Sequence, residues 1–557
     1  MKNNLIAAFI LAAALAAPAA AALPAGDRVF AAMNDELARS MAKLNMDNLG
    51  KPYFITYQVG EGHSYSVSAS FGAIERENSN DFRRLKVDLR VGGPKLDNSH
   101  FAPNVWEGYR TEADWYLPLE DNYDALRFAL WSATDSAYKK ALEVYSKKKA
   151  FIESKGMAEL YDDMTPYEPF ELYRDFTVER LDEPLWRENV RKVSAVFTRY
   201  PAVKSSQVRL SFGSGGLRTL NSEGSASRQP DCGGSVIIAV SGYAPDGFPL
   251  KFSHRESFCL AKDAPPMERL LAKAAELGDT LTSMGKSEQL KAYIGPVLFE
   301  APAAGKFFET LLVNNVANPR EVWTEKNRWN NDSVFRRAGT LVERLGMRVT
   351  SPFLNVVDDP LARYHEGVPL SGFYEVDDEG VPAQRLDLVK KGKLADYYMS
   401  RAATRDFKKS NGHGRGDLRE FPAGSPSNVF ILAENNPGRV LSAAGLKAKF
   451  LELCKEQELE YCILVKGIDG LYGPFAAWKV YLDGREEPVH GIEFTGVTLR
   501  ALRDITAVSK ETYVHDLSWS TPGTVVAPAI LVQEMEIKKS EEKPEKKPYL
   551  AHPYFGK

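Results

Sequence analysis

The chain has 557 residues, of which 44% are hydrophobic and 26% charged, and its formal net charge at pH 7 is −3. This length exceeds what a single hydrophobic core usually organises, so we expect two or three domains. The near-neutral charge argues against a nucleic-acid-binding protein, which would carry an excess of Lys and Arg.

The N-terminus has the pattern of a secretory signal peptide. Lys2 carries a positive charge, residues 5–17 form an apolar run, and residues 18–22 are small and suit cleavage. A retained membrane anchor is the alternative, but the apolar run is short for a bilayer. We predict that residues 1–22 are removed, that the protein is exported to the periplasm or the exterior, and that no membrane-spanning segment remains.

Residues 23–286 predict an N-terminal domain that mixes helices and strands. Apolar residues at helical spacing predict a helix over residues 28–43. Aromatic and β-branched residues in alternation predict strands over residues 52–59, 64–74 and 84–91. Together they suggest an antiparallel meander that lies against the helix.

The same domain contains a helical insertion at about residues 123–190. Amphipathic patterns predict a long helix over residues 123–157 and a further helix over residues 183–190. Strands separated by turns follow, and a helix over residues 266–284 leads out of the domain.

A second domain, of the α+β class, is predicted over residues 287–538. Beyond it the chain is charged and contains proline, so residues 539–557 predict a disordered tail. The histidines of this half, His365, His413, His490 and His515, show no metal-binding spacing.

Glu300 lies near the start of the second domain, in the sequence GPVLFEAPAAGKFFETLL of residues 295–312. An apolar run meets an amphipathic helix at this carboxylate. It could serve as a general base, but its neighbours Phe299 and Ala304 offer no metal ligand. The alternative is a charge that interacts favourably with the helix dipole. We treat Glu300 as a candidate, vestigial catalytic residue.

An acidic turn follows at Asp377, Asp378, Glu379 and Gly380, between two strand-like segments. Carboxylates grouped in this way could bind calcium or magnesium, although the spacing of an EF-hand is absent. The alternative that we favour is a solvated hairpin turn.

The loop SNGHGRGD, residues 410–417, alternates glycine with polar residues. Its glycines free backbone N–H groups, and His413 and Arg415 suit an anion or a peptide carboxylate. The pattern is neither a P-loop nor a dinucleotide fingerprint. With Asn428, which begins the next strand, these residues form our predicted peptide- or anion-binding set. The alternative is a mobile loop.

The four cysteines are Cys232, Cys259, Cys454 and Cys462. In an oxidising compartment they could form the disulfides 232–259 and 454–462. Buried free thiols are equally compatible with the sequence. No C-x-x-C occurs, so neither a zinc ribbon nor a thioredoxin motif is indicated.

The order of several short segments resembles the TldD/PmbA family, once called modulators of DNA gyrase. In the second half these segments are VDDEGVPAQRLDLVKKGKL, SNGHGR followed by SNVFI, and KVYLDGREEPVHGIEFTGVTLRALRDITAVS. In the first half PYFITYQV, SASFGAIE, RLKVDLRVG and LDNSHF are similar to the N-terminal domain of exported members. The resemblance implies an α+β fold of two domains, an N-terminal α/β layer and a C-terminal domain with a largely antiparallel sheet and flanking helices. It also implies a dimer that encloses a cavity.

Active members of that family are zinc metallopeptidases, with HExxxH on a helix and a Cys-Gly near the C-terminus. The resemblance places the family's LLHEAVGH on VLFEAPAA, so that its histidine positions fall on Phe299 and Ala304 and its glutamate on Glu300. The Cys-Gly region falls on residues 515–532, which contain no Cys. All three zinc ligands are therefore expected to be missing, and we predict no bound metal.

We accordingly expect a metal-free subunit that assists proteolysis or peptide handling. It would act on a peptide substrate as a homodimer, or as a heterodimer with a paralogue that carries HExxxH. Two alternatives stay open. One is an active metallopeptidase in which Glu300 converges with histidines from the set His365, His413 and His515. The other is a protein that binds a peptide or an anion through residues 410–417.

Overall fold

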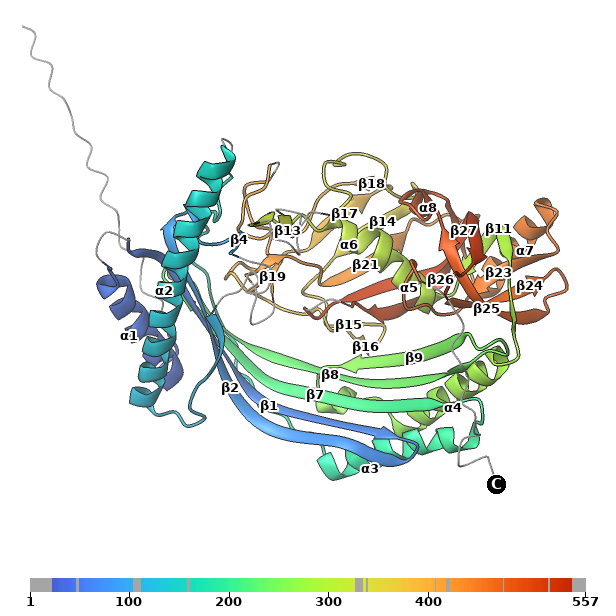
Figure 1. The fold of residues 1–557 in the computed structure, drawn as a ribbon, viewed down its shortest axis with the longest axis horizontal. Helices are drawn as coiled ribbons and strands as arrows, with labels where there is room; N and C mark the ends of the chain where they lie inside the picture. Colours follow the sequence, from blue (N-terminus) through green and yellow to red (C-terminus); the bar gives the residue numbers. More distant parts are fainter. Residues whose placement is uncertain are drawn as a thin grey trace, which may run out of the picture.

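The computed structural model describes residues 23–46, 50–103, 112–157, 161–325, 334–336, 339–405, 407–416, 421–473, 475–518 and 521–542. Two large sheets dominate the fold (Figure 1). The first, built from residues 52–258, is a long curved layer, and the second, built from residues 288–539, faces it with its own helices. The α+β class expected from the sequence is confirmed.

The first sheet is antiparallel except at the edge strand β6. Its strands are β1 (Pro52–Ser70), β2 (Ala73–Gly93), β3 (Leu96–Asp97), β5 (Glu112–Tyr116), β6 (Glu171–Tyr173), β7 (Ser205–Asn221), β8 (Ala226–Tyr243) and β9 (Pro249–Phe258). They lie in the order β3-β2-β1-β7-β8-β6, with β5 paired to β2 and β9 paired to β8.

Strand β1 is longer than the sequence pattern suggests. The segments 52–59 and 64–74, which we expected to be two strands, form one strand up to the reversal at Gly72. Gly62 lies within it because β7 approaches closely: a Cβ on Gly62 would lie 2.2 Å from the carbonyl oxygen of Ser214. Gly62 therefore marks close backbone packing and not a turn.

Four helices cover the two ends of the first sheet (Figure 1). They are α1 (Arg28–Lys43) and α2 (Tyr123–Lys155) at one end and α3 (Glu183–Ala195) and α4 (Met267–Met284) at the other. The side chains of Asp27, Asn122 and Asp182 accept hydrogen bonds from the first turns of α1, α2 and α3. These N-caps explain where three of the predicted helices begin.

Each end of the first sheet has its own hydrophobic core, and β1 passes through both. Ile55 and Tyr57 belong to the core beneath α1 and α2. Val67 and Ala69 belong to the core beneath α3 and α4.

The second sheet is mostly antiparallel, with parallel pairs at β11–β23, β21–β27, β22–β26 and β10–β25. Its strands are β10 (Glu288–Gln289), β11 (Ala292–Phe299), β14 (Leu354–Asp358), β17 (Leu386–Lys390), β18 (Lys393–Leu394), β21 (Asn428–Ala433), β22 (Val440–Leu441), β23 (Tyr461–Val465), β24 (Phe475–Tyr481), β25 (Glu486–Thr495), β26 (Ile505–Asp516) and β27 (Thr524–Lys539). The main order is β10-β25-β24-β23-β11-β27-β21-β14-β17-β18, and β26 pairs with β27.

Smaller pairings complete this half of the fold. They are β4 (Phe101–Ala102) with β12 (Val322–Thr324) and β13 (Val334–Arg336), β15 (Tyr364–His365) with β16 (Val368–Pro369), and β19 (Gly414–Arg415) with β20 (Ala423–Gly424). The helices are α5 (Ala301–Phe308), α6 (Asn314–Val316), α7 (Ala443–Glu456) and α8 (Arg500–Arg503). A π-helical turn, Glu309–Val313, joins α5 to α6. Helix α5 lies against β26 and β27.

Both candidate disulfides are formed. Cys232 in β8 bonds to Cys259 just beyond β9, and Cys454 in α7 bonds to Cys462 in β23. None of the helices described combines the length and the hydropathy that a membrane crossing requires.

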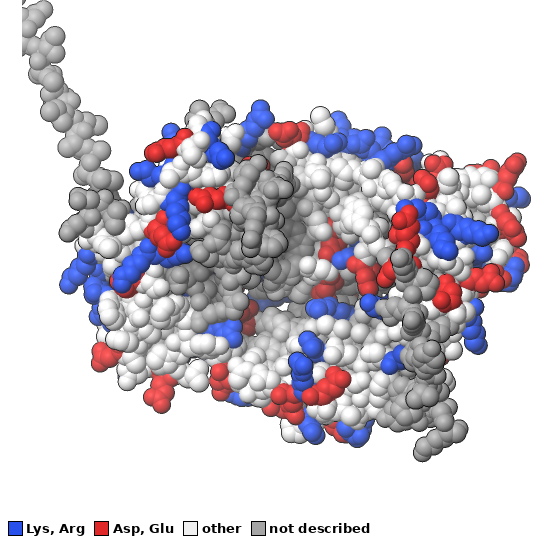
Figure 2. Space-filling model, in the orientation of Figure 1, with Lys and Arg blue, Asp and Glu red and all other residues white. Residues whose placement is uncertain are grey.

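Buried polar contacts join the two halves. Arg401, 2% exposed, donates to the carbonyl oxygen of Thr165 and to the carboxylate of Glu223, which lies in the turn between β7 and β8. Gln229 of β8 hydrogen-bonds both backbone groups of Val376. Figure 2 shows charged side chains of both signs along the line where the halves meet.

Candidate functional site

Glu300 follows β11 directly and stands at the N-cap position of α5. Its backbone N–H donates to the carbonyl oxygen of Val465 at 2.9 Å, and its own carbonyl accepts from Ala304 at 2.8 Å. Its side chain makes no capping hydrogen bond. Burial raises the pKa of Glu300, and the charge of Lys466 opposes that effect. The carboxylate therefore does not stabilise the helix start as a capping acceptor would.

The two neighbours that would carry zinc ligands are parts of the core. Phe299 and Ala304 are both fully buried. The ring of Phe299 packs 5.1 Å from that of Phe307 and 5.6 Å from that of Phe494. These side chains have no donor atom for a metal, and their space is filled by other apolar groups. The residues at these positions do not fit zinc.

His515 reaches the same helix, but one to two turns further along. A Cβ on Gly305 would lie 2.4 Å from the Cβ of His515, so only glycine permits this approach. The Nε2 atom of His515 lies 2.9 Å from Oε2 of Glu309. Nζ of Lys306 donates to the same oxygen at 3.0 Å, and the N–H of Ser518 donates to Oε1 at 3.0 Å. We call Lys306, Glu309 and His515 the α5 ion cluster.

The α5 ion cluster is largely shielded from solvent. Glu309 is 2% exposed, whereas the side chains of His515 and Lys306 are 20% and 13% exposed. Burial alone would raise the pKa of Glu309, but the hydrogen bond to His515 and the charge of Lys306 hold it below its usual value. Sequence reasoning missed Glu309 and Lys306, because an i, i+3 Lys–Glu pair on a helix is common and gives no sign of a distant histidine.

The other histidines have separate partners. His365 Nε2 lies 2.8 Å from Oγ1 of Thr512, and His490 Nδ1 lies 2.8 Å from Oγ of Ser287. Among the described residues, the one set of three His, Cys, Asp or Glu ligand atoms that converge does not include Glu300. The expectation that Glu300 meets two histidines in a non-standard metal site is therefore wrong.

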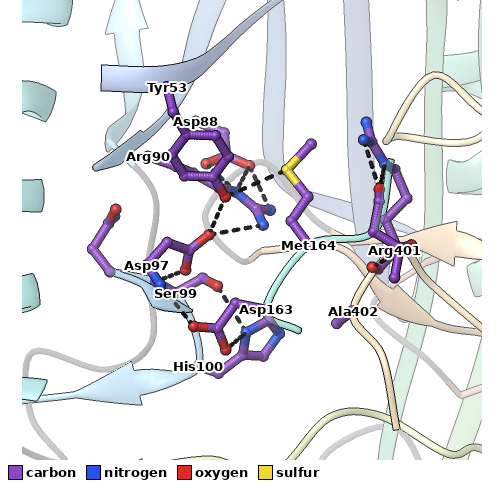
Figure 3. Close-up of polar contacts among 12 residues, drawn as sticks. Tyr53, Asp88, Arg90, Asp97, Ser99, His100, Asp163, Met164, Arg401 and Ala402 are labelled. Atoms are coloured by element: carbon purple, nitrogen blue, oxygen red, sulfur yellow. Dashed lines mark hydrogen bonds and ion pairs between the residues drawn. The ribbon is translucent and has the colours of Figure 1, made fainter. Parts of the chain in front are cut away.

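That converging set is Asp97, His100 and Asp163, in the N-terminal half (Figure 3). Its carboxylates are already compensated by cations. Lys148 Nζ donates to Asp163 at 2.5 Å, and Arg90 lies 3.5 Å from Asp97. Burial lowers the pKa of His100 to about 4. These side chains fit a buried ion network better than a metal site, because the ammonium of Lys148 already supplies the positive charge.

His413 and Asn428, two of the predicted ligand-binding residues, are fully buried. The amide oxygen of Asn428 accepts from the N–H of Gly372 and the hydroxyl of Thr524, and its NH₂ group donates to the carbonyl of Ala362. Nε2 of His413 lies 3.5 Å from Asp358. These contacts fix the loop to the second sheet, and the structure does not bring the two side chains to a surface. Asp417 lies outside the described residues.

Arg415, like His413, has a buried nitrogen without a hydrogen-bond partner among the described residues. Its Nε lies 3.4 Å from Oδ2 of Asp378, and its guanidinium stacks 4.2 Å from the ring centre of Tyr374. Its Nη1 is buried and has no hydrogen-bond partner among the residues described. Asp231 of β8 interacts with the Arg415 charge from the other half of the molecule.

The acidic turn is buried, so the expectation of a solvated hairpin is wrong. Asp377 accepts hydrogen bonds from the N–H groups of Glu379, Val381 and Gly414. Glu379 accepts from the N–H of Arg401 at 2.6 Å, and burial raises its pKa to about 7. The turn is thus part of the contact between the two halves, and its carboxylates serve backbone groups instead of a calcium ion.

The sequence is similar to a known protein family and to a curated relative. Residues 293–539 match a family model described as the PmbA/TldA metallopeptidase C-terminal domain. A protein of Archaeoglobus fulgidus described as a metalloprotease is 30% identical over 100 residues, which cover 18% of this chain and 22% of that relative. The match thus spans about a fifth of the length of the curated relative.

Solved structures share the fold over most of the chain. TldE from Thermococcus kodakarensis superposes with a TM-score of 0.56 at 15% identity, covering 91% of this chain and 99% of its own. A protein described as a modulator of a DNA gyrase from Thermotoga maritima gives 0.55 at 16%, with coverages of 87% and 96%. A similarly described protein from Bacteroides thetaiotaomicron gives 0.57 at 13%, with coverages of 92% and 98%.

Proposed function

Because the chain belongs to the TldD/PmbA family, we propose that it is an exported, metal-free member that handles peptides without being the hydrolytic subunit. One observation carries the proposal: the expected zinc positions, Phe299 and Ala304, are buried and apolar. The imidazole that does reach the helix, that of His515, is engaged by Glu309. Among the described residues at this helix, two donor side chains meet one ammonium, whereas zinc needs three or four donors.

Export is supported by the sequence of residues 1–22 and by both disulfides. Disulfides persist in oxidising compartments and are rare in the cytosol of most organisms. Signal-peptide cleavage is tested by N-terminal sequencing of the protein recovered from the medium or the periplasm. Recovery of an intact Met1 from the soluble cytosolic fraction would contradict this part of the proposal.

The lack of zinc ligands at Phe299 and Ala304 points to a partner subunit that carries them. A protein that holds a peptide but lacks a metal either passes the peptide to a hydrolytic site elsewhere or only binds it. We therefore propose a heterodimer with an HExxxH-bearing paralogue for the first case, and a homodimer for the second. Co-expression with such a paralogue, followed by size exclusion, distinguishes the two. A protein that remains monomeric alone and in the mixture contradicts both.

Metal analysis tests the central claim. The purified chain is dialysed against zinc and then against buffer, and its metal content is measured by elemental analysis. We expect well below one zinc per chain, and peptide hydrolysis only after the paralogue is added. Stoichiometric zinc in the isolated chain, together with hydrolysis of an unstructured peptide, would overturn the proposal.

Arg415 favours a second function, the capture of a peptide between the halves. Nη1 of Arg415 is a buried donor with no hydrogen-bond partner in the part of the chain that the structure describes, and Asp378 and the solvent-exposed Asp231 surround it with negative charge. Although Asp231 reaches solvent, the protein encloses it enough that desolvation raises its pKa. Two carboxylates beside one guanidinium disfavour the binding of an anion. The ligand that fits is the N-terminal end of a peptide: its ammonium suits the carboxylates, and the carbonyl oxygen of its first residue accepts a hydrogen bond from Nη1.

The peptide site is tested with Arg415→Ala and a fluorescent unstructured peptide. We expect about a tenfold loss of affinity for one charge-assisted hydrogen bond. Arg405→Ala removes an exposed guanidinium and serves as the control. Unchanged affinity in Arg415→Ala would show that the peptide is not held there.

A further inference from the structure

The pair Glu309–His515 has the geometry of half a metal site. The oxygen and nitrogen that face each other are 2.9 Å apart. Two ligands of a tetrahedral zinc ion, each bonded at 2.0–2.1 Å, lie about 3.3 Å apart. The carboxylate is buried and the imidazole is partly open to solvent, so a cation bound between them would be both sheltered and reachable.

A cation is already present at this pair. Nζ of Lys306 lies 3.0 Å from the same Oε2 that faces His515, and it also lies 3.1 Å from Oγ of Ser518. Lys306 is one helical turn before Glu309, so the helix itself delivers the ammonium to the carboxylate. Its side chain is 13% exposed and its charge lowers the pKa of Glu309.

We propose that the ammonium of Lys306 is the resident cation of the α5 ion cluster and that it excludes zinc from the Glu309–His515 pair. This inference rests on the proposed metal-free function and gives it a cause within the chain. Phe299 and Ala304 explain why ligands are absent from the start of the helix. They say nothing of the pair Glu309 and His515 farther along, where two side chains of zinc-ligand type already lie side by side.

Charge and space both disfavour zinc at this pair. A divalent ion next to an ammonium at hydrogen-bonding distance from the same oxygen would meet strong repulsion in a poorly solvated place. Displacing the ammonium would cost its contacts with Glu309 and Ser518, while gaining only two protein ligands. Zinc sites need three or four ligands, so the exchange is unfavourable.

Position 306 also offers the missing ligand. Residues 306 and 309 stand at i and i+3 on one helical face, so a donor side chain at 306 and Glu309 face the same space. Lys306→His would therefore replace the excluding charge by a third donor and create a His₂Glu set, which is a known zinc-ligand combination. The inference predicts that a single substitution turns a metal-free chain into a zinc protein.

The experiment compares zinc affinity in the full protein, by competition with a chromophoric chelator and by elemental analysis. The proteins compared are wild type, His515→Ala, Lys306→His, Lys306→Cys, and Lys306→His combined with His515→Ala. Lys273→His is the matched control, because Lys273 forms the same i, i+3 contact with Glu276, at 2.7 Å on α4, in an exposed position. Circular dichroism and thermal unfolding check that each variant folds.

We expect Lys306→His and Lys306→Cys each to bind one zinc at least a hundredfold more tightly than wild type, and the added His515→Ala to abolish the gain. Lys273→His should not differ from wild type. If folded Lys306→His and Lys306→Cys gain no zinc, the inference is overturned while the metal-free proposal stands. If the wild type binds one zinc and loses it on His515→Ala, the inference and the proposed function both fail. If the wild type binds zinc that His515→Ala does not remove, the proposed function fails, and with it this inference.

Discussion

Nε2 of His515 lies 2.9 Å from Oε2 of Glu309, although the two residues are 206 positions apart in the chain. The contact joins the end of strand β26 to the π-helical turn after α5, and Lys306 donates to the same carboxylate oxygen. Insertions of a π-turn into an α-helix are frequent at functional sites. The cluster therefore ties the end of β26 to the helical segment that begins with α5.

Glu309→Gln should destabilise the fold. The substitution leaves the ammonium of Lys306, 13% exposed, without its counter-charge, and we expect a loss of roughly 2–3 kcal/mol. Urea unfolding measures the change. Glu276→Gln, which breaks an exposed pair on α4, should cost less than about 1 kcal/mol. Equal effects in the two variants would contradict a buried cluster.

Glu300→Gln should leave both fold and activity intact. Burial raises the pKa of Glu300, so its charged form is disfavoured in the folded state, and this group contributes stability at low pH that is lost as the pH rises through its folded pKa. Removing the charge should leave the melting temperature at pH 8 unchanged or slightly higher. In a complex with an active paralogue, hydrolysis should persist, whereas replacing the paralogue's HExxxH glutamate should abolish it. Loss of hydrolysis in a stable Glu300→Gln protein would restore a catalytic role.

Acid should weaken the N-terminal half through His100. Its folded pKa of about 4 lies below the unfolded value of 6.5, so the unfolded chain binds the proton first. Stability is therefore complete above pH 6.5 and is lost as the pH falls toward 4, by about 2 kcal/mol at pH 5. Urea unfolding at pH 7 and pH 5 should show this loss in wild type and a smaller one in His100→Gln. Identical pH dependence in the two proteins would mean that His100 is not the group responsible.

The two disulfides should differ in their contributions. Cys232–Cys259 closes a longer loop than Cys454–Cys462, with sequence separations of 27 and 8. In the loop-entropy description the longer loop contributes about 1 kcal/mol more. Thermal unfolding of the double variants Cys232→Ala/Cys259→Ala and Cys454→Ala/Cys462→Ala tests the order. Mass spectrometry without reductant checks that both bonds exist in the purified protein.

Arg401→Lys should loosen the contact between the halves. Arg401 donates from three nitrogens to Thr165 and Glu223, and a lysine cannot reproduce that fork. We expect a loss of about 3 kcal/mol, from a pair that is largely buried on the arginine side. Arg405→Lys, at an exposed pair with Glu343, is the control and should have little effect. Limited proteolysis should cut Arg401→Lys first between the halves.

Local patterns predicted the elements well, because their causes are local. The N-caps Asp27 and Asn122 and the apolar periodicity that follows them fix the starts of α1 and α2. The family resemblance also gave the fold class, because the order of several short segments carries more information than any one of them.

The site could not be predicted in the same way. Glu309 is part of a site only because it contacts His515, and no helical or strand periodicity in the sequence relates these two residues. Likewise, Asp377 and Glu379 look like a solvated turn in the sequence, and only the approach of Gly414 and Arg401 shows that they are buried acceptors. Contacts between distant segments decide both cases.

Strand β1 holds a further consequence for how this protein can change. Ile55 and Tyr57 fill one core and Val67 and Ala69 fill the other, with an unbroken ladder to β2 between them. Side chains alternate along a strand, so one residue inserted between Gly60 and Ser64 would turn every later side chain of β1 to the opposite face. A single inserted residue in the middle of β1 is therefore compatible with both cores only where a β-bulge absorbs it, whereas a substitution keeps the alternation.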